Sequence, residues 1–205
     1  GRKPDKNCIK PNGRYMSGNV RSVICKEVSL KKTKELSKKM NLTVNDLMLG
    51  ITSKALSNIL TYKETNQKNI RNPAIHFKVI PEKKRDYTYG NQFVSLTVYL
   101  KLIESLDEAC AHAKKLMNGL KRSTQPGAFF TLLEFYGFFM PQWFCSKVSE
   151  TSGAKHSLMF SNVPGFIKPV KYLGGITRRF FYAGCGTGNI ATSIVMVSML
   201  KRFQI

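Results

Sequence analysis

Residues of the types that perform catalysis are few and scattered in this chain of 205 residues. The histidines His76, His112 and His156 are isolated from one another, and none has an acidic residue four positions later. An isolated histidine is usually a packed or surface residue, so we interpret all three as structural. The sequence also lacks paired carboxylates, a metal-ligand cluster and the G-x-S-x-G motif. We therefore assign no catalytic residue, metal or cofactor.

A glycine-rich stretch, GCGTGN at residues 184–189, is similar in composition to a phosphate-binding loop. It lacks the Lys-Ser/Thr pair of a P-loop, and the segment that follows predicts a strand rather than a helix. We interpret it as a tight connection.

The stretch SNVPG, residues 161–165, is the first pattern that suggests a site. Pro164 forces extended geometry on the residue before it, and Gly165 can adopt positive φ, so the chain should leave a sheet abruptly here. The Asn162 amide would then lie at a strand end, and strand ends that border a cleft are where sites form. Ser161 to Gly165 is either part of such a site or only a turn.

A second pattern starts a helix. Thr43 is an expected N-cap, with Asp46 three residues later as in a capping box, and apolar residues follow at helical spacing. Asn45 and Asp46 are therefore expected in the first helical turn, where Asp46 has at least a capping role.

The other segments predict a mixture of helices and strands. Helices are expected over residues 29–40, capped by Ser29, and over 105–123. Strands are expected over residues 19–30, 72–81, 91–102, 157–163, 178–184 and 189–200, with a charged loop over 82–90. This order indicates an α/β or α+β domain over residues 18–205, preceded by an extended basic linker or cut edge over 1–17.

Residues 127–145, GAFFTLLEFYGFFMPQWFC, form the most apolar stretch and carry one charge, Glu134. The length is at the lower limit for crossing a membrane, and Gly137, Pro141 and Gln142 interrupt it. A buried or interfacial helix is the preferred interpretation over a transmembrane one.

The chain is strongly basic, with 33 Lys and Arg against 12 Asp and Glu and a net charge of +21. Such a surface should attract polyanions. The basic residues are spread along the chain, and no RNP-type aromatic signature, zinc-finger spacing or basic heptad helix accompanies them. A solvated basic face or contact with an anionic membrane is therefore favoured over nucleic acid binding.

The cysteines are odd in number and contain no C-x-x-C pair, which fits buried thiols rather than a disulfide framework or a zinc site. They are Cys8, Cys25, Cys110, Cys145 and Cys185. We expect an intracellular, reducing compartment, with membrane association or a mitochondrial location left open.

Four segments in order resemble the C-terminal half of the wax ester synthase/diacylglycerol acyltransferase family. They are TVNDLMLGITSKAL, GNQFVSLTVYL, FSNVPGFIKPVKYLGG and the glycine-rich loop that enters NIATSIVMVSML. The resemblance implies one chloramphenicol-acetyltransferase-like half of the condensation-domain superfamily, a mixed sheet flanked by helices. It also implies that Asn45, Asp46 and Ser161 to Gly165, including Asn162 and Pro164, line or brace a substrate tunnel.

The family's catalytic signature, His-His-x-x-x-Asp-Gly, lies in the other half, and this chain contains no His-His pair. Two hypotheses follow. In the first, the chain is the C-terminal domain of an O-acyltransferase, incomplete without an N-terminal half on the same precursor or another chain, with acyl-CoA as a substrate and not a cofactor. In the second, it is a non-catalytic subunit or scaffold that binds lipid or a protein partner.

Overall fold

A computed structural model describes most of the chain. The described residues are Ile9, 19–63, 74–79, 94–166, 168–177, Ile190, 192–200 and 202–204. The expected linker over 1–17 lies outside them apart from Ile9, and so do the loop 82–90, the strand 178–184 and the glycine-rich stretch 184–189.

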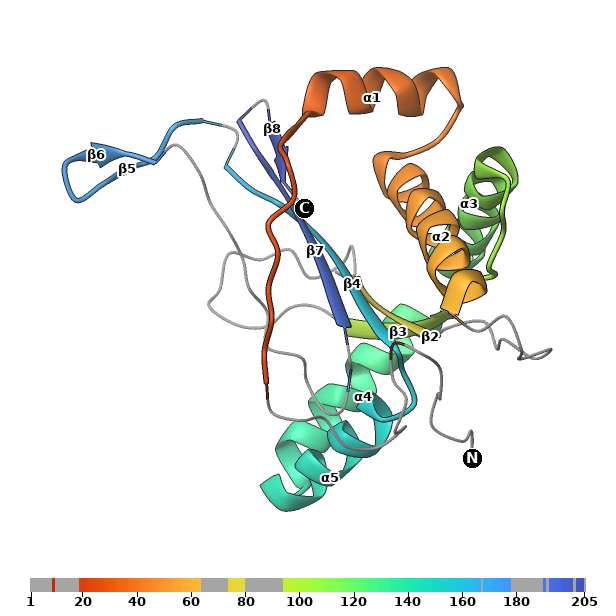
Figure 1. The fold of residues 1–205 in the computed structure, drawn as a ribbon. Coiled ribbons are helices and arrows are strands. Elements are labelled where there is room, and N and C mark those ends of the chain that lie inside the picture. Colours follow the sequence, from red (N-terminus) through yellow and green to blue (C-terminus); the bar gives the residue numbers. More distant parts are fainter. Residues whose placement is uncertain are drawn as a thin grey trace.

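A mixed six-stranded sheet forms the centre of the fold (Figure 1). Its spatial order is β1 (Val28–Ser29), β8 (Arg202–Gln204), β7 (Thr192–Met199), β4 (Leu158–Pro164), β2 (Ala74–Val79) and β3 (Val94–Tyr99). The central strands β2, β4 and β7 are mutually parallel, and the outer pairings are antiparallel. The carboxyl ends of β4 and β7 therefore lie at one edge of the sheet, which is the edge where open α/β sheets bind ligands.

Five helices accompany the sheet in the described part of the chain. They are α1 (Leu30–Lys39), α2 (Val44–Lys63), α3 (Leu106–Arg122), α4 (Gln125–Phe139) and α5 (Gln142–Gly153). The paired helices α2 and α3 contribute Leu49 and Met117 to a core that also contains Leu158 and Phe160 of β4. Figure 1 shows α1 and the α4–α5 pair at opposite ends of the sheet.

The helices α2 and α3 approach each other closely at Gly50. A Cβ atom at this position would lie 2.5 Å from the Sγ atom and 2.8 Å from the Cα atom of Cys110. Cys110 is buried as expected, and this burial raises the pKa of its thiol. Cys25, in contrast, is exposed.

Several expected elements are confirmed. Ser29 caps α1, and its hydroxyl accepts a hydrogen bond from the Lys32 amide. Ser105 caps α3 in the same way. The strands expected over 72–81, 91–102, 157–163 and 189–200 appear as β2, β3, β4 and β7.

The strand expected over 19–30 is wrong for most of its length, because only Val28–Ser29 pairs, and it pairs with β8. Residues 19–27 have no regular structure and leave Val20 and Val23 exposed. Alternating apolar residues favour a strand only where a neighbouring strand lies beside them, and among the described residues strand pairing in this segment is confined to Val28–Ser29.

Residues 127–145 were expected to form a buried or interfacial helix, and the buried alternative is wrong. The segment forms α4 and the start of α5, broken at Pro141, and α4 contains no buried residue. Gly137 does not interrupt α4. Among the described helices, none has both the length and the apolar composition that spanning a bilayer requires.

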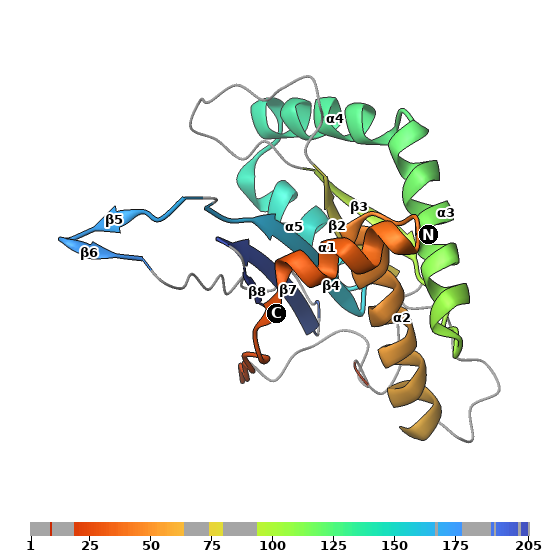
Figure 2. The same cartoon turned by 90° about the horizontal axis from the view of Figure 1, so that it is seen from above.

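A hairpin that the sequence did not predict projects from the body of the molecule (Figure 2). It consists of β5 (Lys171–Tyr172) and β6 (Gly175–Ile176). The turn residues Leu173 and Gly174 have φ values of 48° and 77°, the left-handed conformation that tight hairpin turns require.

Candidate functional site

The two patterns that the sequence analysis selected meet at the carboxyl end of β4. The Asn162 side-chain amide donates a hydrogen bond to the side-chain oxygen of Asn45, although the two residues are 117 positions apart. Asn162 lies near the end of β4, and Asn45 lies in the first turn of α2. This bond holds the start of α2 against the sheet edge at which the parallel strands end.

Asp46 has the capping role that was expected. Its Oδ2 atom accepts a 2.9 Å hydrogen bond from the Thr43 amide, and the Thr43 hydroxyl accepts a 3.2 Å bond from the Asp46 amide. This reciprocal pair is a capping box. Asp46 is only 2% exposed, and its Oδ1 atom has no hydrogen-bond partner among the described residues. A buried carboxylate at the start of a helix is stabilised by the helix dipole.

The stretch Ser161 to Gly165 combines a buried residue with an abrupt exit from the sheet. Ser161 is 4% exposed, whereas Asn162 is half-buried. Pro164 ends β4, and the Gly165 amide donates a 2.7 Å hydrogen bond to the Ser198 carbonyl of the neighbouring strand.

The reason expected for Gly165 is wrong, because this residue does not adopt positive φ. A Cβ atom at position 165 would lie 2.6 Å from the Ser198 carbonyl oxygen. Glycine is required here because the backbone passes very close to β7. Sequence reasoning missed Ser198, and no sequence signal marks it, because only its main-chain carbonyl takes part.

The histidine His156 is buried at the start of β4, and both of its ring nitrogens have partners. Nδ1 lies 2.8 Å from the Ser152 carbonyl oxygen, to which it must donate, and Nε2 lies 2.7 Å from the Thr97 hydroxyl. This geometry places a proton on Nδ1 and ties α5 to β3 through a residue just before β4. It agrees with a structural role for His156.

His112 lies on α3, and its Nε2 atom is buried without a hydrogen-bond partner among the described residues. Burial and the nearby Lys101 ammonium lower the pKa of the imidazole. The side chain of His76 lies outside the described residues. In the described part of the chain, His, Cys, Asp and Glu side chains do not gather in groups of three that could hold a metal.

The described elements define an α/β domain with a mixed sheet and a candidate site at the carboxyl ends of its parallel strands. The fold is similar to that of the wax ester synthase/diacylglycerol acyltransferase from Marinobacter aquaeolei VT8, with a TM-score of 0.54 and 14% sequence identity. The similarity covers 88% of this chain and 41% of that one. A weaker likeness, with a TM-score of 0.44, relates it to the first condensation domain of the CDA synthetase, at 12% identity over 92% of this chain and 41% of that one.

Residues 89–205 match the family model of the WS/DGAT C-terminal domain. The match covers more than half of the chain, and the chain belongs to the wax ester synthase/diacylglycerol acyltransferase family. It spans about two fifths of the length of the Marinobacter enzyme. Comparison with curated proteins finds no match. The family resemblance noted in the sequence is thereby confirmed. The matched range includes Ser161 to Gly165 but not Asn45 and Asp46.

Proposed function

We propose that this chain is the C-terminal domain of an O-acyltransferase that transfers a fatty acyl group from acyl-CoA to a fatty alcohol or a diacylglycerol. The observation that carries the proposal is the hydrogen bond between Asn45 and Asn162. It joins two of the segments that resemble the family, and it does so at the edge where open α/β sheets bind ligands.

The proposed role of this site is to hold and shape a tunnel wall. The capping box fixes the direction in which α2 begins, and the Asn45–Asn162 bond fixes its distance from β4. The close contact between Gly165 and Ser198 turns the chain away from the sheet beyond Asn162. Each of these contacts fixes the course of the main chain at this edge.

Acyl transfer to an alcohol requires a base that removes the hydroxyl proton while the oxygen attacks the thioester carbonyl carbon and the CoA thiolate leaves. Neither His112 nor His156 is placed for that task, because His112 lies on α3 and His156 is bonded at both nitrogens. We propose that a half carrying His-His-x-x-x-Asp-Gly supplies the base, on the same precursor or on another chain.

The test compares the 205-residue chain alone with the same chain joined to, or mixed with, such a half. Release of the CoA thiol is measured with and without a long-chain alcohol or a diacylglycerol. We expect no acceptor-dependent release from the chain alone and clear release when the His-His half is present. Acceptor-dependent turnover by the chain alone would contradict the proposal that another half supplies the base. Absence of turnover both from the chain alone and from the chain with the His-His half would contradict the proposed activity.

A non-catalytic subunit is the second candidate, and the surface of α4 and α5 favours it. Phe138 and Trp143 are 82% and 72% exposed, and most other large apolar side chains of α4 are also exposed. Exposed apolar surface of this kind marks contact with a membrane or a protein. A chain that binds such a partner, yet remains inactive with every His-His half offered, would fit this alternative.

A further inference from the structure

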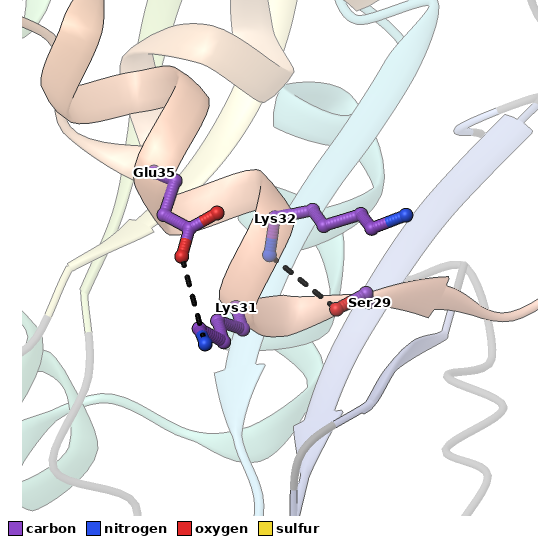
Figure 3. A network of polar contacts seen from close by, with 4 residues as sticks. All are labelled: Ser29, Lys31, Lys32 and Glu35. Atoms are coloured by element: carbon purple, nitrogen blue, oxygen red, sulfur yellow. Dashed lines mark hydrogen bonds and ion pairs between the residues drawn. The ribbon is translucent and has the colours of Figure 1, made fainter.

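An open groove of about 350 Å³ runs beside α1. Its walls come from one helix and from the turn that follows β7, and the residues that line it are Leu30, Lys31, Lys34, Glu35, Lys38 and Leu200. Figure 3 shows part of this helix, with Lys31 and Glu35 on one side and Lys32 extending away from them.

The groove is cationic. Lys31, Lys34 and Lys38 follow one another at spacings of three and four residues, so their side chains lie along one face of α1. Glu35 is the acidic residue of the lining, and it approaches Lys31 at 4.0 Å with both side chains well exposed, which makes a weak pair. Among the described residues, no carboxylate forms an ion pair with Lys34 or Lys38. The lining therefore carries more positive than negative charge.

The position of the groove relates it to the candidate site. Leu200 comes directly after β7, and its amide donates a 2.9 Å hydrogen bond to the Phe166 carbonyl, just beyond Gly165. The groove thus lies at the same carboxyl edge of the sheet as Asn162. In Figure 1, α1 lies above this edge and the α4–α5 pair lies at the other end of the molecule.

The lining also contains two apolar side chains, Leu30 and Leu200, which are half-buried and lie beside the lysines. A groove with lysines along one helix face and leucines beside them suits an amphiphilic ligand, in which an anionic group is joined to an apolar chain. Phosphate is the anion that lysines bind as point charges, without the fixed geometry of an arginine fork.

We propose that the groove beside α1 binds the phosphate group of an amphiphilic substrate whose apolar part extends toward Asn162. Two kinds of molecule have this chemistry: an acyl-CoA, through its phosphates, and an anionic phospholipid, through its headgroup. The first of these rests on the proposed acyltransferase function, whereas the second does not.

The test measures binding to the full 205-residue chain for a groove variant and a matched control. The groove variant is Lys34→Gln with Lys38→Gln, and the control is Lys32→Gln with Lys39→Gln on the same helix. Both change the net charge equally, and neither Lys32 nor Lys39 lines the groove. All four lysines are exposed, so both variants should unfold at nearly the same temperature as the parent chain.

The ligands are palmitoyl-CoA below its micelle concentration, its 3′-dephospho derivative, and vesicles of phosphatidylcholine with or without phosphatidic acid. We expect the groove variant to weaken binding of a phosphate-bearing ligand about tenfold or more, because two charge-assisted contacts are lost, and the control to change it less than about twofold. Loss confined to the CoA ligands identifies a nucleotide phosphate, and loss confined to phosphatidic acid identifies a headgroup.

Equal weakening by both variants would show that only the overall charge matters and would overturn the proposal, as would unchanged binding in the groove variant. Because these measurements record binding without turnover, they do not depend on the assay of the proposed function. If the groove variant bound normally in an enzyme that is active, the proposed phosphate site would be refuted and the proposed acyltransferase function would not.

Discussion

At the scale of single residues, a double-mutant cycle can measure the energy of the Asn45–Asn162 hydrogen bond apart from the other contributions of the two side chains to stability. We expect Asn45→Ala and Asn162→Ala to be coupled by about 1 kcal/mol in the free energy of unfolding, the size of a typical hydrogen bond. Denaturant unfolding of the parent, single and double variants measures this coupling. Additive effects would show that the bond contributes nothing to the fold.

The same variants test the proposed tunnel wall when the His-His half is present. If Asn162 positions substrate as well as α2, Asn162→Ala should lower the transfer rate by much more than its stability loss explains. Variants that melt earlier but turn over normally while folded would assign the Asn pair to architecture alone.

Gly165 gives a prediction at the scale of single residues, and another glycine of the same chain, Gly119, serves as its control. Gly165→Ala should destabilise the fold by about 1–3 kcal/mol, because its methyl group would meet the Ser198 carbonyl oxygen. Gly119→Ala in the exposed part of α3 meets nothing within 4 Å and should instead stabilise by about 0.5–1 kcal/mol. Thermal unfolding of both variants is the measurement. A neutral Gly165→Ala would show that β4 and β7 can separate there without cost.

His112 should make stability depend on pH. Burial, and secondly Lys101, lower the pKa of its imidazole in the folded state, so the unfolded chain binds the proton more readily. The contribution of His112 is therefore fully present above about pH 6.5 and is lost as the pH falls through the lowered pKa. His112→Gln should lose less stability than the parent between about pH 7.5 and 5.5. Parallel stability curves for the two chains would refute this.

At the scale of elements, the sequence predicted those whose signals are local. The helices α1, α2 and α3 begin at Ser29, Thr43 and Ser105, where a side-chain oxygen caps the first amides. Such a cap needs only neighbouring residues, so the pattern suffices. The strand expected over 19–30 and the buried alternative for 127–145 were wrong, because strand pairing and helix burial depend on which distant parts of the chain pack beside a segment. Apolar composition alone does not supply that information.

The capping box of α2 is the element-scale test. Thr43→Ala should cost about 1 kcal/mol, the usual loss for an N-cap. Asp46→Asn keeps an oxygen that can accept from the Thr43 amide, so only the interaction of the charge with the helix dipole is lost, about 0.3–1 kcal/mol. The two unfolding free energies are compared directly. A much larger loss for Asp46→Asn would mean that its buried Oδ1 atom has an unrecognised stabilising partner.

At the scale of the whole molecule, the candidate site depends on long-range topology. No periodicity or local motif predicts that Asn45 and Asn162 meet, since the parallel pairing of β4 and β7 and the packing of α2 bring them together. The sequence pointed to both residues through the turn, the cap and the family resemblance. The groove beside α1 was missed, although the spacing of Lys31, Lys34 and Lys38 was visible, because its second wall is the distant turn at Leu200.

The net charge of +21 and the exposed apolar surface of α4 and α5 give the last prediction, which concerns membranes. Binding to vesicles should rise with the fraction of anionic lipid and fall with added salt, because spread surface charges act through screened electrostatics. The binding that remains at high salt should come from aromatic side chains that enter the interface.

Phe138→Ala with Trp143→Ala should therefore reduce this salt-resistant binding, and Leu173→Ala with Ile176→Ala, which removes exposed apolar groups from the β5–β6 hairpin, serves as the control. Vesicle sedimentation at low and high salt measures the salt-sensitive and the salt-resistant parts of the binding. If the α4–α5 variant retained its salt-resistant binding while the hairpin variant lost it, the membrane-facing surface would be the hairpin. If neither salt nor anionic lipid changed the binding of the parent chain, its positive charge would have no part in membrane contact.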